Sequence, residues 1–535
     1  MPADDLIAER RRKLDQLAVL GVPSHNVDFT PTETLDGARR LLARMEVDSS
    51  GASAADEAPD GPEVRVAGRV MQYRLQGKSC FVHVEDEGER MQVWLRLDRL
   101  GDDEFAVVRL LDLGDIIGVR GNLMRTRRGE PTVLASALTL LVKSLQPPPE
   151  KFHGLQDQET RYRKRYLHLL SSAAQRRHFA ARTTVVRSLR RTLDNRGFME
   201  AETPILQPIP GGGHALPFVT HWNALHADVY LRIAIELHLK RLLVGGYRRV
   251  YEIGRVFRNE GLSPRHNPEF TMLEAYEAYT DYHGMRELTE SLIVDAANAL
   301  GPQQIPEQDG GTFPCDDPLR RSFGGRELSL TPPFRCERMV DLVAQACDFN
   351  PVEAWDDLPE RAHALGAPVP IGAGAGAALL AIYEHRVEPE LWDPTFVLDY
   401  PAEVSPLARK RRDDQRFVER FELVVAGREV ANAFSELNDP LDQRQRFEEQ
   451  ASLRAAGDDE AFPLDEDFLE AIEVGMPPAG GLGIGVDRLV MLLTDAATIR
   501  DVLLFPTMRP RHREEASAED VNQSSPPSAE DSERP

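Results

Sequence analysis

The stretch FRNEGLSPRHNPEFTMLEAY, residues 257–276, decides how the fold can be interpreted. Arg258 and Glu260 stand two apart, a patch rich in Gly, Ser, Pro and Asn follows, and apolar and polar residues then alternate. If 257–260 and 269–276 are two strands joined by a loop, a period of two places Arg258 and Glu260 on one face of the first strand. The same period gives one face of the second strand Phe270, Met272, Glu274 and Tyr276.

A strand face that mixes an arginine, carboxylates and aromatic rings does not suit a buried core, because unpaired buried charge is costly. A solvated face, in turn, has no need of Phe, Met and Tyr. The mixture favours the floor of a pocket, in which a ring stacks on a ligand, an arginine binds an anion and carboxylates hold a cation. The alternative is a network of internal salt bridges.

A second stretch, RFELVVAGREVANAFSELND at 420–439, contains Glu422, Glu429 and Glu436. Its Ala-Gly pair at 426–427 suits a tight turn, so Glu422 and Glu429 are expected to face each other across a hairpin. Opposed carboxylates repel each other unless a cation lies between them. Mg²⁺ bound by carboxylates together with substrate phosphates is the obvious candidate. In the alternative, both side chains turn into solvent.

A third stretch, GGLGIGVDRLVMLLT at 480–494, spaces its glycines as Gly-x-Gly-x-Gly but is neither a Walker loop nor a convincing dinucleotide-binding turn. We expect Asp487 to cap the helix that follows. Arg488 then lies in the first turn, where a cation is unfavourable near the positive end of the helix dipole. A bound phosphate would explain it. The alternative is that the glycines only allow close packing of strand and helix.

Bulk properties limit the class of protein. The chain has 535 residues, a formal net charge of −23 and no apolar run near the roughly 18 residues that a membrane helix needs. No secretory signal is predicted, and none of the four cysteines forms a CxxC pair or a zinc-spaced cluster, which favours a cytoplasmic protein. The negative charge argues against a generic nucleic-acid binder. Residues 161–191 nevertheless hold ten Lys or Arg and no Asp or Glu, as either a solvated helix face or a local phosphate-contacting surface.

The order of short patterned segments predicts the domains. Between 62 and 146 the order is strand-strand-strand-helix-strand-strand, which is that of an all-β OB-fold barrel. From about 181 strands and helices mix without βαβ regularity, which indicates an α+β domain around an antiparallel sheet. The expected division is an N-terminal helix and connector at 1–61, the barrel at 62–146, a basic linker at 147–180, a catalytic domain at 181–512 and a disordered acidic tail at 513–535.

The three stretches occur together with a fourth, RGFMEAETPIL at 196–206, in a telling order. That fourth stretch resembles motif 1 of the class II aminoacyl-tRNA synthetases, FRNE…HNPEF resembles motif 2, and GLGIGVDRL at 481–489 resembles motif 3. The preceding barrel is similar to that of the subgroup with the lysyl, aspartyl and asparaginyl enzymes. Further blocks, among them YLRIAIELHLKRLLVGG at 230–246 and DYPAEVSPLAR at 399–409, resemble the lysyl-tRNA synthetases. The resemblance covers roughly residues 5–510 and implies a homodimer formed through motif 1.

The resemblance implies activation of L-lysine by ATP to lysyl-adenylate and pyrophosphate, followed by transfer of lysine to the 3′ end of tRNA(Lys). It gives catalytic roles to Arg258 and Arg488, and makes Glu422 and Glu429 the ligands of Mg²⁺. The implied ATP-binding residues are Arg258, Glu260, His266, Asn267, Phe270, Glu422, Glu429 and Arg488.

The resemblance also implies two recognition sites. Glu436, with Tyr276, would hold the ε-ammonium of lysine, and the implied lysine-binding residues are Gly212, Glu236, Arg258, Glu274, Tyr276, Asn432, Phe434 and Glu436. In the barrel, Phe81, Gln92 and Glu130 match positions that stack on and read the anticodon. The alternative for Phe81 is a core strand residue.

Some positions depart from the family. Ala431 and Ala433 stand where the family has glycines, Leu216 replaces Arg, Ile235 replaces Pro and His238 replaces an aromatic residue. Two other functions are conceivable: a ligase that lysylates an acceptor other than tRNA, and a non-catalytic RNA-binding paralogue. The intact barrel argues against the first, and retention of Arg258, Glu422, Glu429 and Arg488 argues against the second.

Overall fold

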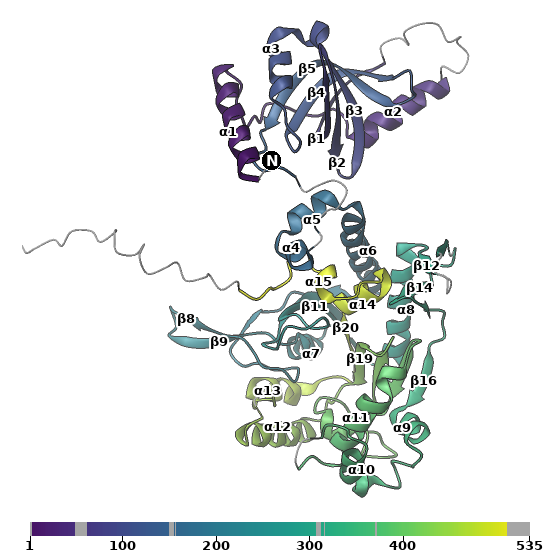
Figure 1. The fold of residues 1–535 in the computed structure, drawn as a ribbon. Coiled ribbons are helices and arrows are strands. Elements are labelled where there is room, and N and C mark those ends of the chain that lie inside the picture. The colour runs from purple at the N-terminus through teal and green to yellow at the C-terminus, as the bar shows by residue number, and fades with distance from the viewer. Residues whose placement is uncertain are drawn as a thin grey trace, which may run out of the picture. The chain divides into compact units, whose positions relative to one another are not determined.

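The computed structural model describes residues 3–48, 61–148, 155, 157–306, 312–314, 316–369, 372–458 and 460–510. The chain divides into two compact units, Met1–Arg177 and His178–Pro535 (Figure 1). The predicted acidic tail and most of the predicted connector lie outside the described residues. Among the helices that are described, none is both long and apolar enough to cross a lipid bilayer.

The first unit contains a closed barrel with strand order β1-β2-β3-β5-β4. The strands are β1 (Glu63–Gln76), β2 (Ser79–Asp86), β3 (Glu89–Arg96), β4 (Ile116–Arg125) and β5 (Pro131–Val142), with α3 (Leu97–Leu110) between β3 and β4. Helices α1 (Ala3–Val19) and α2 (Leu35–Asp48) precede them, and α4 (Gln158–Arg163) and α5 (Arg165–Ser171) follow. The predicted all-β barrel is therefore confirmed, with its helix in the expected place.

Strict alternation builds the barrel. Along β2, Cys80 and Val82 are fully buried in the barrel core, whereas the alternating Phe81 and His83 are partly exposed.

At one end of the barrel, the buried ammonium of Lys143 lies 2.7 Å from a carboxylate oxygen of the buried Asp115. Arg10 of α1 donates to the carbonyl of Ser144 at 2.8 Å, which ties the N-terminal helix to the same end.

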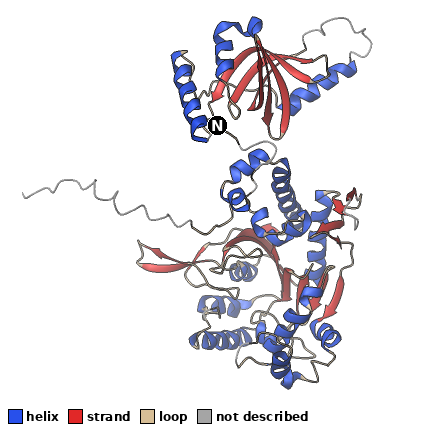
Figure 2. Cartoon of the chain, in the orientation of Figure 1, coloured by secondary structure: helices blue, strands red, loops and turns tan. Residues whose placement is uncertain are grey.

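The second unit is built on an eight-stranded sheet with order β16-β17-β18-β19-β20-β11-β10-β6, shown as the large red sheet of Figure 2. Its strands are β6 (Met199–Glu200), β10 (Arg249–Phe257), β11 (Glu269–Ala278), β16 (Arg335–Arg338), β17 (Thr395–Leu398), β18 (Arg420–Val424), β19 (Glu429–Ser435) and β20 (Ala479–Gly485). The six central strands pair antiparallel, and only β6 and β16 at the two edges pair parallel. The predicted α+β domain around an antiparallel sheet is confirmed.

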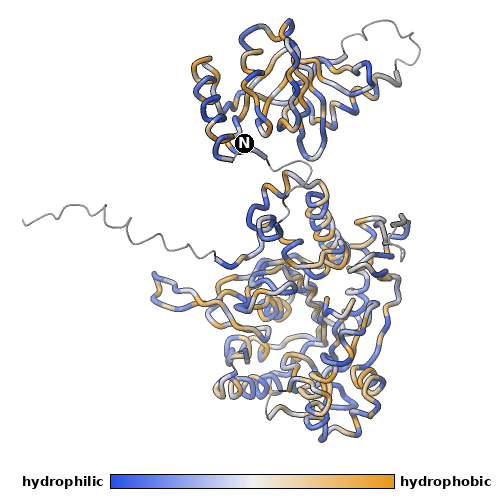
Figure 3. Tube along the Cα trace, in the orientation of Figure 1, coloured by the Kyte–Doolittle hydropathy of each residue, from blue (hydrophilic) through white to orange (hydrophobic). Residues whose placement is uncertain are grey.

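Helices cover the sheet with apolar residues. On one face α6 (Ala173–Asn195), α8 (Tyr282–Leu300) and α14 (Val486–Thr494) bury the largest core cluster of the unit. Helix α6 ends at Asn195, and two residues later Gly197 adopts a φ of 77°, which glycine tolerates best. Helix α12 (Pro440–Ala455) is hydrophilic along most of its length (Figure 3) and buries Phe447 against α13 (Glu466–Gly475) and α7 (Glu236–Val244).

The remaining elements are short. A three-stranded sheet has the order β7-β9-β8, and β12 pairs with β13 and β14 with β15. They are β7 (Leu206–Gln207), β8 (Val219–Trp222), β9 (Ala227–Leu231), β12 (Gln304–Pro306), β13 (Thr312–Pro314), β14 (Arg320–Phe323), β15 (Arg326–Ser329), α9 (Met339–Cys347), α10 (Leu358–Ala364), α11 (Ala375–Arg386) and α15 (Ile499–Val502). Three 3₁₀ turns span Trp355–Asp357, Glu388–Glu390 and Ala402–Val404.

Two local predictions are wrong in detail. Strand β10 ends at Phe257, so Arg258 and Glu260 lie in the loop that follows and not on a strand face. Asp487 does not cap α14: the N-cap is Gly485, and Asp487 lies inside the first turn. Asp487 is buried and accepts hydrogen bonds from Arg182 and from the Thr271 N–H, so tertiary partners outweigh its capping preference.

The hairpin prediction also needs correction. In the register of β18 and β19, Glu422 pairs with Asn432, and Glu429 pairs with Val424 next to a bulge. The two glutamates are therefore offset along the hairpin and not directly opposite.

Four of the ten basic residues of the segment 161–191 form ion pairs with described residues of the fold, a role that neither a solvated helix face nor a phosphate-contacting surface describes. They are Arg163, Arg176, Arg182 and Arg190, which pair with Glu159, Glu85, Asp487 and Glu200 respectively.

Candidate active site

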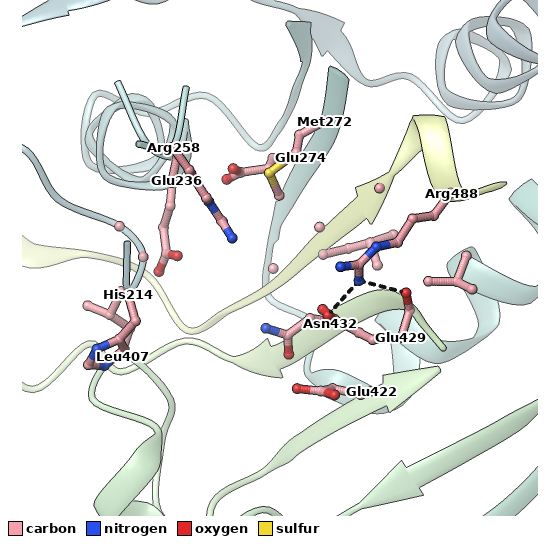
Figure 4. Close-up of a pocket in the computed structure, with 18 of the residues that line it drawn as sticks. His214, Glu236, Arg258, Met272, Glu274, Leu407, Glu422, Glu429, Asn432 and Arg488 are labelled. Carbon is pink, nitrogen blue, oxygen red and sulfur yellow. Dashed lines mark hydrogen bonds and ion pairs between the residues drawn. The ribbon is translucent and has the colours of Figure 1, made fainter. Parts of the chain in front are cut away.

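A cavity of about 530 Å³ lies over the strands of the large sheet. Fourteen residues expected at an ATP or lysine site line it: Gly212, Glu236, Arg258, Glu260, His266, Asn267, Phe270, Glu274, Tyr276, Glu422, Glu429, Asn432, Phe434 and Arg488. Figure 4 shows Glu236 and Glu274 toward one side, and Glu422, Glu429 and Arg488 toward the other. We call these sides the amine end and the phosphate end.

Alternation along β11 supplies one wall of the cavity. Phe270, Met272, Glu274 and Tyr276 all line it, as the period of two predicts. On the other side of the sheet, Leu273 and Ala275 are fully buried in the helix-covered core. The strand thus separates an apolar packing face from a face that carries chemistry.

The amine end is a buried group of acids. Glu274 accepts hydrogen bonds at 2.9 Å from the Ile235 N–H and from the Tyr276 hydroxyl. Burial, and then the charge of Glu236, raise the pKa of Glu274 to about 7. Glu236 accepts a hydrogen bond from Lys240 one helical turn away on α7. Burial opposes the charge on Lys240, but Glu236 and Glu436 outweigh it and raise the pKa of its ammonium.

Glu436 differs from the expectation that it lines the lysine pocket directly. It is fully buried behind Gly481, and its Oε2 forms an ion pair with Lys240. Its Oε1 has no hydrogen-bond partner among the described residues. A Cβ built on Gly481 would lie 1.8 Å from that oxygen. Since Gly481 lines the cavity, the absence of a side chain there is what brings the free carboxylate oxygen next to it.

Among the described residues, four arginines line the cavity, Arg258, Arg265, Arg420 and Arg488. Figure 4 shows Arg258 beside Glu236 at the amine end and Arg488 beside Glu429 at the phosphate end. No ion pair joins Arg258 to a carboxylate within the described part of the chain; its guanidinium lies 5.3 Å from the ring centre of Phe270, and Nε donates to the Ile233 carbonyl at 3.4 Å. Arg488 donates at 3.0 Å both to the carbonyl and to the carboxylate of Glu429, as the dashed lines in Figure 4 show. A cavity with an uncompensated Arg258 attracts an anion.

His266 and Asn267 also line the cavity. His266 accepts at Nε2 from Arg488 over 3.5 Å, and burial together with the charge of Arg488 lowers the pKa of His266. Asn267 is buried, donates to the Glu269 carbonyl at 2.7 Å and accepts from the Thr507 N–H at 3.3 Å. Gly212 adopts a φ of 83°, which allows its backbone to face the cavity where an L side chain would be strained.

Glu422 and Glu429 fit a divalent cation that also binds substrate oxygens. Burial, and then the charge of Glu429, raise the pKa of Glu422 to about 7, and a cation between the two would relieve that repulsion. In the described residues no group of three or more His, Cys, Asp or Glu side chains is arranged to hold a metal ion. Two carboxylates with several remaining ligand positions are the arrangement that Mg²⁺ uses with phosphates.

Sequence reasoning missed Lys240, Arg420, Gly481 and His214. Lys240 follows Glu236 by four residues on a helix, and Arg420 precedes Glu422 by two on a strand, so spacing could have found both. His214 and Gly481 line the cavity from a loop and from β20, and no local pattern indicates that.

The departures from the family have definite places. Ala431 and Ala433 face the helix-covered core and not the cavity, so their methyl groups do not crowd it. Ile235 provides the N–H that bonds to Glu274, a donor that proline lacks. His238 lies 3.5 Å from Gln207 through Nδ1. Leu216 accepts the backbone N–H of Asn259 at 2.7 Å, and nothing in the structure explains its side chain.

The barrel gathers the three residues expected to read the anticodon. Gln92 donates to Glu130 at 2.7 Å and accepts from Thr132 at 2.9 Å, and His83 lies 2.6 Å from the other oxygen of Glu130. The ring of Phe81 stacks on Trp94, with centres 5.2 Å apart and planes 18° apart. Phe81 is partly exposed, which argues against its alternative as a core residue.

Comparison with known proteins covers nearly the whole chain. The family model for tRNA synthetases class II (D, K and N) matches residues 157–509, and the model for the OB-fold nucleic acid binding domain matches residues 64–141. A lysine-tRNA ligase of Moorella thermoacetica is 47% identical over 511 residues, 95% of this chain and 98% of that protein. A lysine-tRNA ligase of Listeria monocytogenes is 47% identical over 512 residues, 95% of this chain and 98% of that protein.

Proposed function

Because the chain belongs to the class II tRNA synthetases of the D, K and N group, we propose that it joins L-lysine to tRNA(Lys) at the expense of ATP. One observation carries the choice of lysine. At the amine end of the cavity, the buried Glu436 keeps one carboxylate oxygen without a partner, while its other oxygen is held by Lys240.

A substrate ammonium satisfies that oxygen. The amine end combines the carboxyl groups of Glu236, Glu274 and Glu436 with the ammonium of Lys240. Burial raises the pKa of Glu274 and of Glu436, so a bound ammonium would favour their ionised forms. The ε-ammonium of lysine donates to Glu436 and Tyr276, and Glu236 and Glu274 bind the α-ammonium near the backbone of Gly212. An uncharged analogue leaves the carboxylates unpaired, which discriminates far more strongly than a missing methylene does.

ATP binds at the phosphate end. Phe270 stacks on adenine, with Glu260, His266 and Asn267 holding base and phosphates, and Arg488 binds the terminal phosphate. Glu422 and Glu429 hold Mg²⁺, which supplies charge neutralisation for the phosphates. Support comes from the raised pKa of Glu422 beside Glu429 and from the position of Arg488 within 3.0 Å of Glu429.

The first step brings two anions together. The lysine carboxylate oxygen bonds to the α-phosphorus, the bond from that phosphorus to the bridging oxygen breaks, and pyrophosphate leaves with the electron pair. Arg258 has no internal ion pair among the described residues, so it is available to bridge carboxylate and phosphate and to stabilise the charge that develops. Positioning and electrostatics of this kind suffice without a general base.

In the second step the ribose hydroxyl at the tRNA 3′ end attacks the acyl carbon, and the adenylate leaves as AMP. Recognition of the anticodon falls to the barrel, where Phe81 stacks on a base and Gln92 and Glu130 contact base edges. The support is that the register of β2 and β3 places Phe81 and Gln92 on the same face of the barrel wall, and that Gln92 is bonded to Glu130. Stacking on an aromatic ring together with contacts to base edges is how proteins read single-stranded RNA.

The protein acts as a homodimer in the cytoplasm. Free thiols at Cys80, Cys336 and Cys347 accord with a reducing compartment.

The motif 1 segment exposes Met199, Ile205 and Leu206, and large apolar side chains at a surface indicate an interface. Sedimentation velocity at micromolar concentration should give a dimer; a monomer would contradict the assignment.

Lysine-dependent exchange of pyrophosphate into ATP, measured with and without tRNA(Lys), tests the function. We expect exchange without tRNA and charging of tRNA(Lys) when it is added. Exchange without charging would indicate a ligase that lysylates another acceptor. A folded protein with neither activity would indicate a non-catalytic paralogue.

A further inference from the structure

Arg420 lies beside Glu422 at the phosphate end of the cavity, and neither the sequence pattern nor the family resemblance assigns it a role. It lies on β18, lines the cavity and is largely buried. Its guanidinium makes four hydrogen bonds: to Asn432 Oδ1 at 3.0 Å, to Glu422 Oε1 at 2.5 Å, to Ser405 Oγ at 2.8 Å and to the Val404 carbonyl at 3.2 Å. The ring of Tyr400 lies 4.4 Å from its central carbon and fixes the plane of the group.

The bond from Arg420 decides which way the amide of Asn432 points. An arginine can only donate, so the atom of Asn432 that it meets must be the carbonyl oxygen. The amide NH₂ is then directed away from Arg420. Within the described residues no partner for that NH₂ is recorded, and Asn432 lines the cavity. Figure 4 shows Asn432 and Glu422 side by side on adjacent strands, with the cavity before them.

The free NH₂ needs an acceptor, and lysine offers only one kind. Both ammonium groups of lysine donate, so its α-carboxylate is its sole hydrogen-bond acceptor. If the amide were reversed, its oxygen would face that carboxylate and repel it. The orientation set by Arg420 therefore suits the carboxylate of an amino acid.

We propose that Arg420 is a positioning residue that aims the Asn432 amide at the α-carboxylate of the bound amino acid. The same guanidinium holds Glu422 and the 404–405 loop, so it fixes the carboxylate-binding group relative to the phosphate end. This inference rests on the proposed function, since it takes the amino acid to be lysine.

Binding of two ligands to the full-length protein, measured by calorimetry without ATP, tests the proposal. L-Lysine carries the carboxylate, and cadaverine is the same chain of two amines without it. Arg420→Met should weaken lysine binding roughly 10- to 100-fold, the loss of one hydrogen bond to a charged group, and should leave cadaverine binding within about twofold. Arg420→Lys keeps the charge but not the planar fork, so it should lose lysine affinity to a similar extent.

A double-mutant cycle shows whether Arg420 acts through Asn432. Asn432→Ala should weaken lysine binding by a similar factor, and adding Arg420→Met to it should cause little further loss. Arg411→Met is the matched control: Arg411 also bonds to a buried carboxylate, that of Asp399, but does not line the cavity, and lysine should bind to this variant as to wild type. Thermal unfolding identifies any variant that fails to fold.

Three results would overturn the proposal: wild-type lysine affinity in both Arg420 variants, an equal loss of lysine and cadaverine binding, or full additivity with Asn432→Ala. Failure of the proposed function would look different, because wild-type protein would then bind neither ligand and show no lysine-dependent exchange.

Discussion

On the barrel, the polar side chains expected to contact the anticodon hydrogen-bond to one another. In and beside the cavity, some charged side chains lack an ion pair, or have an oxygen atom without a partner, among the described residues. Glu130 contacts both His83 and Gln92. In the cavity, by contrast, Arg258 has no ion pair among the described residues, and one oxygen of Glu436 has no partner there.

The difference reflects what each region has to bind. A base stacks on an aromatic ring and forms weak hydrogen bonds with polar side chains. Those side chains can therefore hydrogen-bond to one another when RNA is absent. A reaction between two anions needs charges already in place, because fixed charges need no reorganisation in the transition state. Substitutions in the cavity should therefore abolish chemistry, and substitutions on the barrel should affect only the tRNA.

Arg258→Ala should have the largest effect. The variant loses a cavity arginine that stacks over Phe270 and has no ion pair among the described residues, so lysine-dependent exchange should fall roughly 10³-fold, with charging falling in parallel. Arg411→Met, outside the cavity, serves as the control for folding. Near-normal exchange in Arg258→Ala would show that this arginine does not contact the reacting groups.

Glu436→Gln should come next. It keeps the shape of the side chain but removes the charge that pairs with Lys240 and with the substrate, so the KM for lysine should rise roughly 100-fold or more. The KM for ATP should stay close to the wild-type value. An unchanged KM for lysine would show that Glu436 does not contribute to lysine binding, and that its unpartnered oxygen is not part of the binding site.

Phe81→Ala should affect only the barrel. Loss of one stacked base costs roughly 1–3 kcal/mol, which corresponds to about a 5- to 160-fold rise in the KM for tRNA. Exchange without tRNA should be unchanged. If both activities fell together and the melting temperature dropped, Phe81 would be a folding residue and the two regions would not be separable in this way.

The smallest effect concerns pH. Burial raises the pKa of Glu274 to about 7, so this carboxyl is mostly protonated at pH 6 and mostly ionised at pH 8. Lysine binding should tighten about tenfold over that range, since the ammonium binds the ionised form. The same shift means that the unfolding free energy contributed by Glu274 is lost as pH rises toward 7. Glu274→Gln should flatten the affinity profile; a profile that kept its slope would assign it to another group.

The alternation of β11 made one cavity wall predictable, because a period of two fixes side-chain direction without reference to the rest of the fold. Phe270, Met272, Glu274 and Tyr276 follow it. The order of strands and one helix likewise made the barrel predictable. The offset of Glu422 and Glu429 also follows from the turn, because a turn at Ala426–Gly427 pairs Val424 with Glu429. The bulge beside Val424, which no local pattern indicates, then makes Asn432 the partner of Glu422.

Other features depend on distant parts of the chain. The Oε1 atom of Glu436 lies next to the cavity, without lining it, only because Gly481 on a neighbouring strand has no side chain. The carboxylate of Asp487 does not cap α14 because it accepts hydrogen bonds from Arg182 and from the Thr271 N–H, which lie far from it in sequence.

Pyrophosphate exchange by wild-type and Phe81→Ala protein, assayed with lysine and with no tRNA, tests the central claim most directly. The account predicts lysine-dependent exchange at equal rates in both proteins, with the defect of the variant confined to charging of tRNA(Lys). Exchange that does not depend on lysine, or that fails whenever the barrel face is altered, would contradict it.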